Sequence, residues 1–173
     1  GAYEDLPWIA RLGEYVRELD RRRKPLIGIC FGHQLIAQAL GGRVAKAPQG
    51  WGVGVHEAHI EARAAWLPDD VERFALVSSH QDQVMELPAR AERLAGSAFC
   101  PVAMYRVEQH VFALQSHPEF SRDYSRALMQ ARRDLIDPAR IEAGLASLAR
   151  EPDAAEAARW MLEFLRRAVV APA

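Results

Sequence analysis

The sequence is poor in cysteine and in long apolar runs. Two cysteines, Cys30 and Cys100, are too few for a disulfide framework, which favours the reducing cytoplasm. No apolar run reaches the ~18–20 residues that a membrane helix needs, and the first residues do not resemble a signal peptide. These absences predict a soluble cytoplasmic protein that does not act at a membrane.

The sequence also lacks an excess of charge of either sign. It has 22 basic and 23 acidic residues, so the basic face typical of a nucleic-acid-binding protein is not expected. The one basic cluster, residues 21–24, is interpreted as the solvated end of a helix. His56 and His59 have a spacing found in metal sites, but no cysteine or pair of acids accompanies them. We therefore expect neither a metal nor an organic cofactor.

What is present is sufficient for one folded domain. Half of the 173 residues are hydrophobic, and they recur at helical spacing between Trp8 and Leu19. A short apolar strand, residues 26–29, follows this helix and leads directly into a second helix that ends near Leu40. Further strands are expected at 44–47, 50–60, 74–79, 102–107 and 111–115, and further helices at 124–136, 138–148 and 154–169. This order predicts an α/β fold.

The most informative stretch is residues 28–34, Gly-Ile-Cys-Phe-Gly-His-Gln, at the first strand-to-helix junction. Gly28 and Gly32 allow the close backbone approach that a sharp turn requires. Cys30 would then stand at the start of a helix, where backbone N–H groups favour the thiolate. The pattern indicates a cysteine nucleophile. Cys100, which precedes a proline and has no basic neighbour, is interpreted as a buried small hydrophobe.

A cysteine nucleophile needs a base, and that base needs an orienting acceptor. Among six histidines, His117 ends a predicted strand and is followed two residues later by Glu119. His33 is expected on the packing face of its helix or in solvent, and His110 in a turn. Taken alone, the His117-Pro118-Glu119 sequence is better explained as a turn with an exposed ion pair.

The two motifs together resemble a class I, triad-type glutamine amidotransferase domain, of a stand-alone branch close to the glutaminase domain of GMP synthase. Residues 78–84, Ser-Ser-His-Gln-Asp-Gln-Val, look like that branch's Ser-His-x-Asp loop, and residues 50–54 look like its glycine-bearing strand. The resemblance extends from about Tyr3 to Phe120. It implies a flavodoxin-like, three-layer α/β/α fold with a mostly parallel central sheet.

The resemblance also implies roles for individual residues. Cys30 would attack the side-chain amide of glutamine, His117 would move the protons, and Glu119 would orient His117. The backbone N–H of Phe31 would donate to the oxyanion. The residues implied in substrate binding are Gln34, Ser79, His80 and Asp82.

The chain departs from the family at its start, because fewer residues precede Cys30 than in the family pattern. We expect an amino-terminally truncated single domain over 1–173, with a catalytic core at about 3–120 and a helical segment at 121–173. The first βαβ unit and the loop that gives the second oxyanion donor are then missing.

Three functions fit these residues. The first is hydrolysis of glutamine through a γ-glutamyl thioester on Cys30, with ammonia passed to a separate synthetase partner. The second is cleavage of γ-glutamyl peptides by the same triad, which requires no partner. The third is a truncated, inactive binding module.

Overall fold

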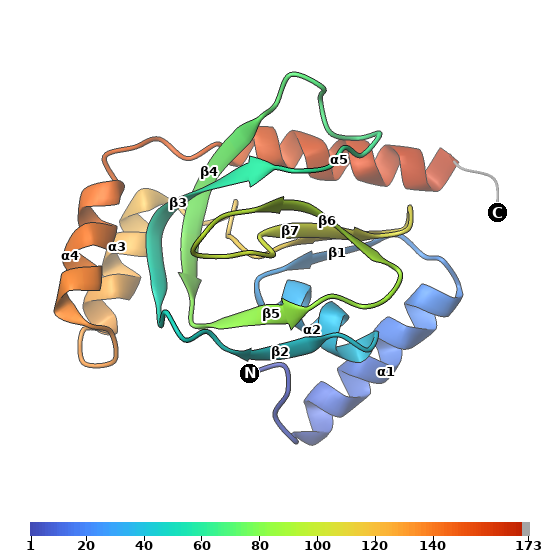
Figure 1. Ribbon diagram of the computed structural model, residues 1–173, viewed down its shortest axis with the longest axis horizontal. Coiled ribbons are helices and arrows are strands. Elements are labelled where there is room, and N and C mark those ends of the chain that lie inside the picture. Colours follow the sequence, from blue (N-terminus) through green and yellow to red (C-terminus); the bar gives the residue numbers. More distant parts are fainter. Residues whose placement is uncertain (171–173) are drawn as a thin grey trace.

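The computed structural model describes residues 1–170, in which helices surround a curled sheet (Figure 1). Residues 171–173 of the predicted helical segment lie outside the described residues. The helices are α1 (Pro7–Arg21), α2 (Phe31–Ala39), α3 (Arg122–Ala131), α4 (Pro138–Ser147) and α5 (Ala154–Val170). The strands are β1 (Leu26–Ile29), β2 (Arg43–Lys46), β3 (Gly52–Ile60), β4 (Arg73–His80), β5 (Asp82–Glu86), β6 (Ala91–Gly96), β7 (Met104–Val107) and β8 (Val111–Leu114).

The larger sheet has the strand order β1-β8-β7-β6-β3-β4, and β2 pairs with β5 in a second, two-stranded sheet. Its β1–β8 pairing is parallel, whereas its other four pairings are antiparallel. The predicted α/β fold is confirmed, and the sheet is mixed rather than mostly parallel. The reason is the short connections: β7 and β8 are joined by residues 108–110, and a tight turn can join only antiparallel strands.

The two faces of the sheet bury different helices. Along β8, Val111 and Ala113 belong to the apolar cluster with α1 and α2, whereas Phe112 and Leu114 belong to the cluster with α5. This alternation follows from the two-residue period of a strand. The helices α3 and α4 lie beside β3 and form a third, smaller cluster (Figure 1). The sheet is thus covered on both faces, which gives the predicted three layers.

One segment differs from its predicted structure. Residues 80–83 were expected as a polar loop, but β4 continues to His80 and β5 begins at Asp82, with a bend at Gln81. Pairing of β5 with β2 fixes this bend, and such long-range pairing is not visible in the local sequence. The prediction for Cys100 is confirmed, because its side chain is buried. None of the helices in residues 1–170 has the length and apolar character needed to cross a membrane.

Candidate active site

The parallel pairing of β1 with β8 brings the two predicted catalytic segments together. The backbone N–H of Cys30 donates to the carbonyl of Leu114 at 2.9 Å, so the pairing extends to the end of β1. The segment after β8 then bonds to β4, where the N–H of His117 donates to the carbonyl of Val77 at 2.7 Å. Carboxyl ends of parallel strands meet at one edge of a sheet, and Cys30 and His117 follow those two ends.

The junction at Cys30 is a sharp and strained turn. Cys30 has φ 48° and ψ −98°, outside the regions that a side chain normally allows. Such a conformation costs about 1–3 kcal/mol and is characteristic of functional sites. At Gly28 an added Cβ would lie 2.5 Å from Ile36 Cδ1 and 2.8 Å from the carbonyl carbon of Gly32, so β1 and α2 can approach only with glycine there.

Burial controls the ionisation of Cys30. Desolvation raises the pKa of its thiol to about 11, although the N–H of Phe31, the charge of Arg132 and a hydrogen bond from Gln115 each favour the thiolate. The expected help from the helix start is therefore present but outweighed. At neutral pH the group is a thiol, and it needs a base before it can attack a carbonyl carbon.

His117 has the partners of a general base. Its Nδ1 lies 2.7 Å from Glu119 Oε1, and Phe120 stacks on its ring at 3.8 Å between centroids with a tilt of 9°. A carboxylate on Nδ1 holds the proton there and leaves Nε2 as the acceptor. In the described chain, the hydrogen bond to Cys30 Sγ comes from Gln115 rather than His117, so proton transfer requires a closer approach of the imidazole.

Two buried amides connect the nucleophile with the bend after β4. Gln34 Nε2 donates to the carbonyl of Asp82 at 2.7 Å and to Gln115 Oε1 at 3.1 Å, and Gln115 Nε2 donates to Cys30 Sγ at 3.6 Å. Gln34, predicted to bind substrate, thus uses its amide nitrogen inside the protein. Gln115 had no predicted role, although its position two residues before His117 is a signal, since such residues share one face of a strand.

The other predicted substrate-binding residues lie at the same bend. Ser79 and Asp82 are half-buried, whereas His80 is buried. Ser79 Oγ accepts a hydrogen bond from Arg132 Nη1 at 2.9 Å, and the Asp82 carboxylate accepts one from the Tyr3 hydroxyl at 3.3 Å. Burial and the neighbouring His56 lower the pKa of His80 to about 4, so its imidazole is neutral at pH 7.

His33 lies in the core rather than in solvent. Its ring is fully buried and packs against Tyr105 at 4.8 Å between centroids. Burial lowers its pKa to about 3, with a smaller contribution from His80. Because His33 stays neutral and is enclosed, it is a packing residue and has no access to a substrate.

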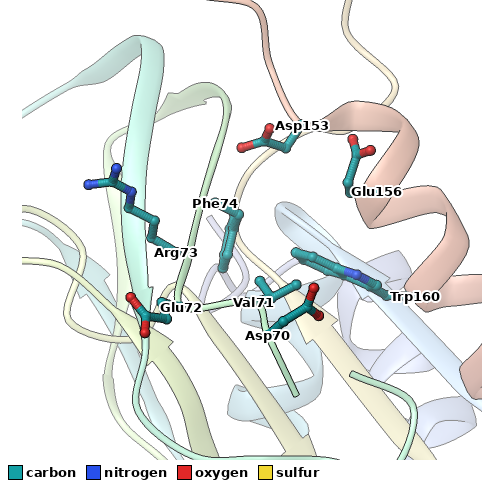
Figure 2. Close-up of a pocket in the computed structure, with 8 residues that line it drawn as sticks. All are labelled: Asp70, Val71, Glu72, Arg73, Phe74, Asp153, Glu156 and Trp160. Atoms are coloured by element: carbon teal, nitrogen blue, oxygen red, sulfur yellow. The ribbon is translucent and has the colours of Figure 1, made fainter. Parts of the chain in front are cut away.

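Two hollows open on the surface of the described chain. One of about 680 Å³ lies beside Glu119 and is also lined by Phe120, Arg122 and Arg126. Figure 2 shows the other, of about 350 Å³, where Phe74 and Trp160 lie among the carboxylates of Asp70, Glu72, Asp153 and Glu156. None of the predicted site residues lines this second hollow. Residues 1–170 contain no group of three or more His, Cys, Asp or Glu side chains that could hold a metal.

A thiol at a strand-to-helix elbow, beside an imidazole–carboxylate pair at the next strand end, is an arrangement suited to cysteine-dependent amide hydrolysis. The model of the family described as glutamine amidotransferase class-I matches residues 8–132, and the chain belongs to this family.

Named relatives fall into two groups. The chain is 38% identical over 128 residues to "Gamma-glutamyl peptidase 3" of Arabidopsis thaliana, covering 70% of this chain and 51% of the relative. It is 35% identical over 120 residues to the glutamine-hydrolyzing subunit of GMP synthase from Methanothermobacter thermautotrophicus, covering 65% and 61%. The chain thus spans about half the length of the peptidase relatives.

Solved structures share the fold at low sequence identity. A glutamine amidotransferase from Thermotoga maritima superposes with a TM-score of 0.75 at 23% identity, over 99% of this chain and 74% of that one. Another from Methylobacillus flagellatus gives 0.78 at 22% identity, over 96% and 72%. These comparisons support the fold assignment.

Proposed function

We propose that this protein hydrolyses γ-glutamyl amide bonds through a thioester on Cys30. The observation that carries the proposal is the Cys30 elbow beside the His117–Glu119 pair, at the joined ends of β1 and β8. Glutamine and γ-glutamyl peptides both contain this bond, so one set of groups serves either substrate. The two free cysteines support action in the reducing cytoplasm.

In the first half of the reaction, His117 Nε2 takes the proton from Cys30, and Sγ attacks the γ-carbonyl carbon. The backbone N–H of Phe31 donates to the oxyanion that forms. As the tetrahedral intermediate collapses, the imidazolium gives its proton to the departing nitrogen. Ammonia or an amine leaves, and a γ-glutamyl thioester remains on Cys30.

The second half repeats these steps with water. His117 Nε2 takes a proton from the water, whose oxygen attacks the thioester carbon, and the proton then returns to the sulfur as glutamate leaves. Glu119 stabilises the imidazolium at both stages, because its carboxylate lies 2.7 Å from Nδ1. The buried thiol, with its raised pKa, is also the better leaving group once it is protonated.

Peptide substrates are favoured by the named relatives, since four γ-glutamyl peptidases of Arabidopsis thaliana match at 32–38% identity. A steady-state assay with the purified protein would compare γ-glutamyl dipeptides with glutamine. We expect a higher kcat/KM for the dipeptides, and no turnover of either by Cys30→Ala. A Cys30→Ala variant as active as the natural protein would contradict the thioester mechanism.

A second candidate is glutamine hydrolysis that delivers ammonia to a synthetase partner. It is favoured by the 35% identity to a relative whose name describes glutamine hydrolysis for GMP synthesis. In that case glutamine would be turned over faster than any γ-glutamyl dipeptide, and a synthetase that uses ammonia would be co-purified. If the folded protein turned over neither substrate, the inactive binding module would be the better account.

We further propose that the working domain includes another βαβ unit, which pairs with β1 and supplies a second oxyanion donor. In the described sheet β1 is an edge strand, and α1 exposes Trp8 and Tyr15, at 54% and 59%. Such an edge and apolar surface are normally covered. A protein that also carries the residues encoded upstream should have a kcat about 10²–10³-fold above that of residues 1–173. Equal kcat values would contradict this proposal.

A further inference from the structure

Arg132 occupies a particular place next to the candidate site. It is the residue that ends α3, and its half-buried side chain extends to the end of β4. There its Nη1 donates to Ser79 Oγ at 2.9 Å, and its guanidinium carbon lies 5.5 Å from the centroid of the Trp51 ring. The serine and the indole hold the guanidinium in one position.

This position faces the nucleophile. Val53 pairs with Ser79 in the β3–β4 register, so Trp51 and Ser79 lie at the end of the sheet where Cys30 also stands. The positive charge of Arg132 is close enough to favour the Cys30 thiolate. A cation at this distance can contact a substrate whose carbonyl carbon is at Sγ.

Within residues 1–170, Arg132 forms no ion pair, and the hydrogen bond to Ser79 is its one described side-chain bond. Most other arginines near the surface pair with a carboxylate, as Arg122 does with Glu151 and Arg150 with Glu57. A guanidinium has five N–H donors in a planar fork that matches a carboxylate. Arg132 therefore has donors available, and the surrounding protein does not neutralise its charge.

We infer that Arg132 is a specificity-determining residue that binds the α-carboxylate of the γ-glutamyl group. This inference rests on the proposed function, in which that group is attached to Cys30. Glutamine and γ-glutamyl peptides share the α-carboxylate, whereas simple amides lack it. The ion pair would select the substrate class and fix the γ-carbonyl carbon above Sγ.

The test measures equilibrium binding in the Cys30→Ala protein, so that it does not depend on turnover. The two ligands are glutamine and 4-aminobutanamide, which is glutamine without its α-carboxylate. We expect glutamine to bind more tightly, and Arg132→Met to weaken glutamine about 10- to 100-fold while leaving 4-aminobutanamide unchanged. Arg132→Lys, which keeps the charge but loses the fork, should fall between the two.

Arg133→Met is the matched control, because Arg133 is an exposed neighbour whose described side-chain bond is to the carbonyl of Gln130. It should leave the affinity for both ligands unchanged. Equal loss for the two ligands in Arg132→Met, no loss for glutamine, or no measurable binding of glutamine by the folded Cys30→Ala protein would each overturn the inference. Glutamine binding that depends on Arg132, in a protein whose natural form has no turnover, would contradict the proposed function and leave this inference standing.

Discussion

At the scale of single residues, the site combines a buried thiol with a histidine that is already oriented. Burial raises the pKa of Cys30 to about 11, so the resting nucleophile is protonated and inert towards most electrophiles. His117 has Glu119 on one ring nitrogen and Phe120 on its face. The substrate must bring these groups together, which protects the thiol until a substrate is bound.

The raised pKa predicts how Cys30 reacts with a small neutral electrophile. In a Cys100→Ala background, the rate of Cys30 alkylation by iodoacetamide should rise about tenfold per pH unit between pH 7 and pH 10, because only the thiolate reacts. The rate is followed by mass spectrometry. A plateau below pH 8 would contradict this account, since it would indicate a thiolate–imidazolium pair in the resting protein.

The buried histidines predict a loss of stability in acid. The pKa of His33 is lowered to about 3 in the folded protein, whereas an unfolded histidine has about 6.5. The unfolded chain therefore binds more protons between these values, and the stability present above pH 6.5 is lost as the pH falls towards 3. His33→Leu cannot take up this proton, so near pH 5 its free energy of unfolding should change less with pH, by about 1.4 kcal/mol per unit. Urea denaturation at several pH values measures the two slopes, and equal slopes would contradict the prediction.

At the scale of elements, the account depends on the close approach of β1 and α2. Gly28→Ala would place a Cβ 2.5 Å from Ile36 Cδ1 and 2.8 Å from the carbonyl carbon of Gly32. The Ile36 side chain can rotate, but the Gly32 backbone cannot move without shifting the start of α2. We expect a loss of about 1–3 kcal/mol in the free energy of unfolding and a fall in kcat.

A matched glycine serves as the control for this substitution. Gly13→Ala in α1 places its Cβ no closer than 3.6 Å to any neighbour, so it should be neutral or stabilising by about 0.5–1 kcal/mol. Thermal denaturation of both variants checks the pair. Equal effects on stability would show that crowding at the elbow is not the cause.

The elements that local patterns predict are those that form locally. The first two helices, the strand before Cys30 and the hairpin of β7 and β8 follow from helical spacing, glycines and a three-residue turn. The order and direction of the strands could not be predicted, because β3 pairs with both β4 and β6, which are distant from it along the chain. The bend between β4 and β5 depends on pairing with β2 for the same reason.

The site divides in the same way. Cys30, His117 and Glu119 could be named because each belongs to a short motif, although their catalytic roles stay predictions. Gln115 and Arg132 could not, since their contacts with Cys30 and Ser79 join segments that are distant in the sequence. Arg132 also lies in a helical region rich in arginine, where nothing local distinguishes it from Arg126 or Arg133.

At the scale of the whole molecule, both faces of the sheet are covered while β1 forms one edge. The chain spans about three quarters of the solved structures that share its fold and about half of its peptidase relatives. The family membership therefore applies to residues 8–132 directly. The substrate and any partner are proposals that depend on what completes the edge beside Cys30.

The central claim is that Cys30 carries a γ-glutamyl thioester. The measurement is intact-protein mass spectrometry after rapid acid quenching of the protein with a γ-glutamyl substrate, followed by peptide mapping. The account predicts an added mass of one glutamyl group on the peptide that contains Cys30, sensitive to hydroxylamine and absent in Cys30→Ala. Turnover of the substrate with no such adduct, or with the adduct at Cys100, would contradict it.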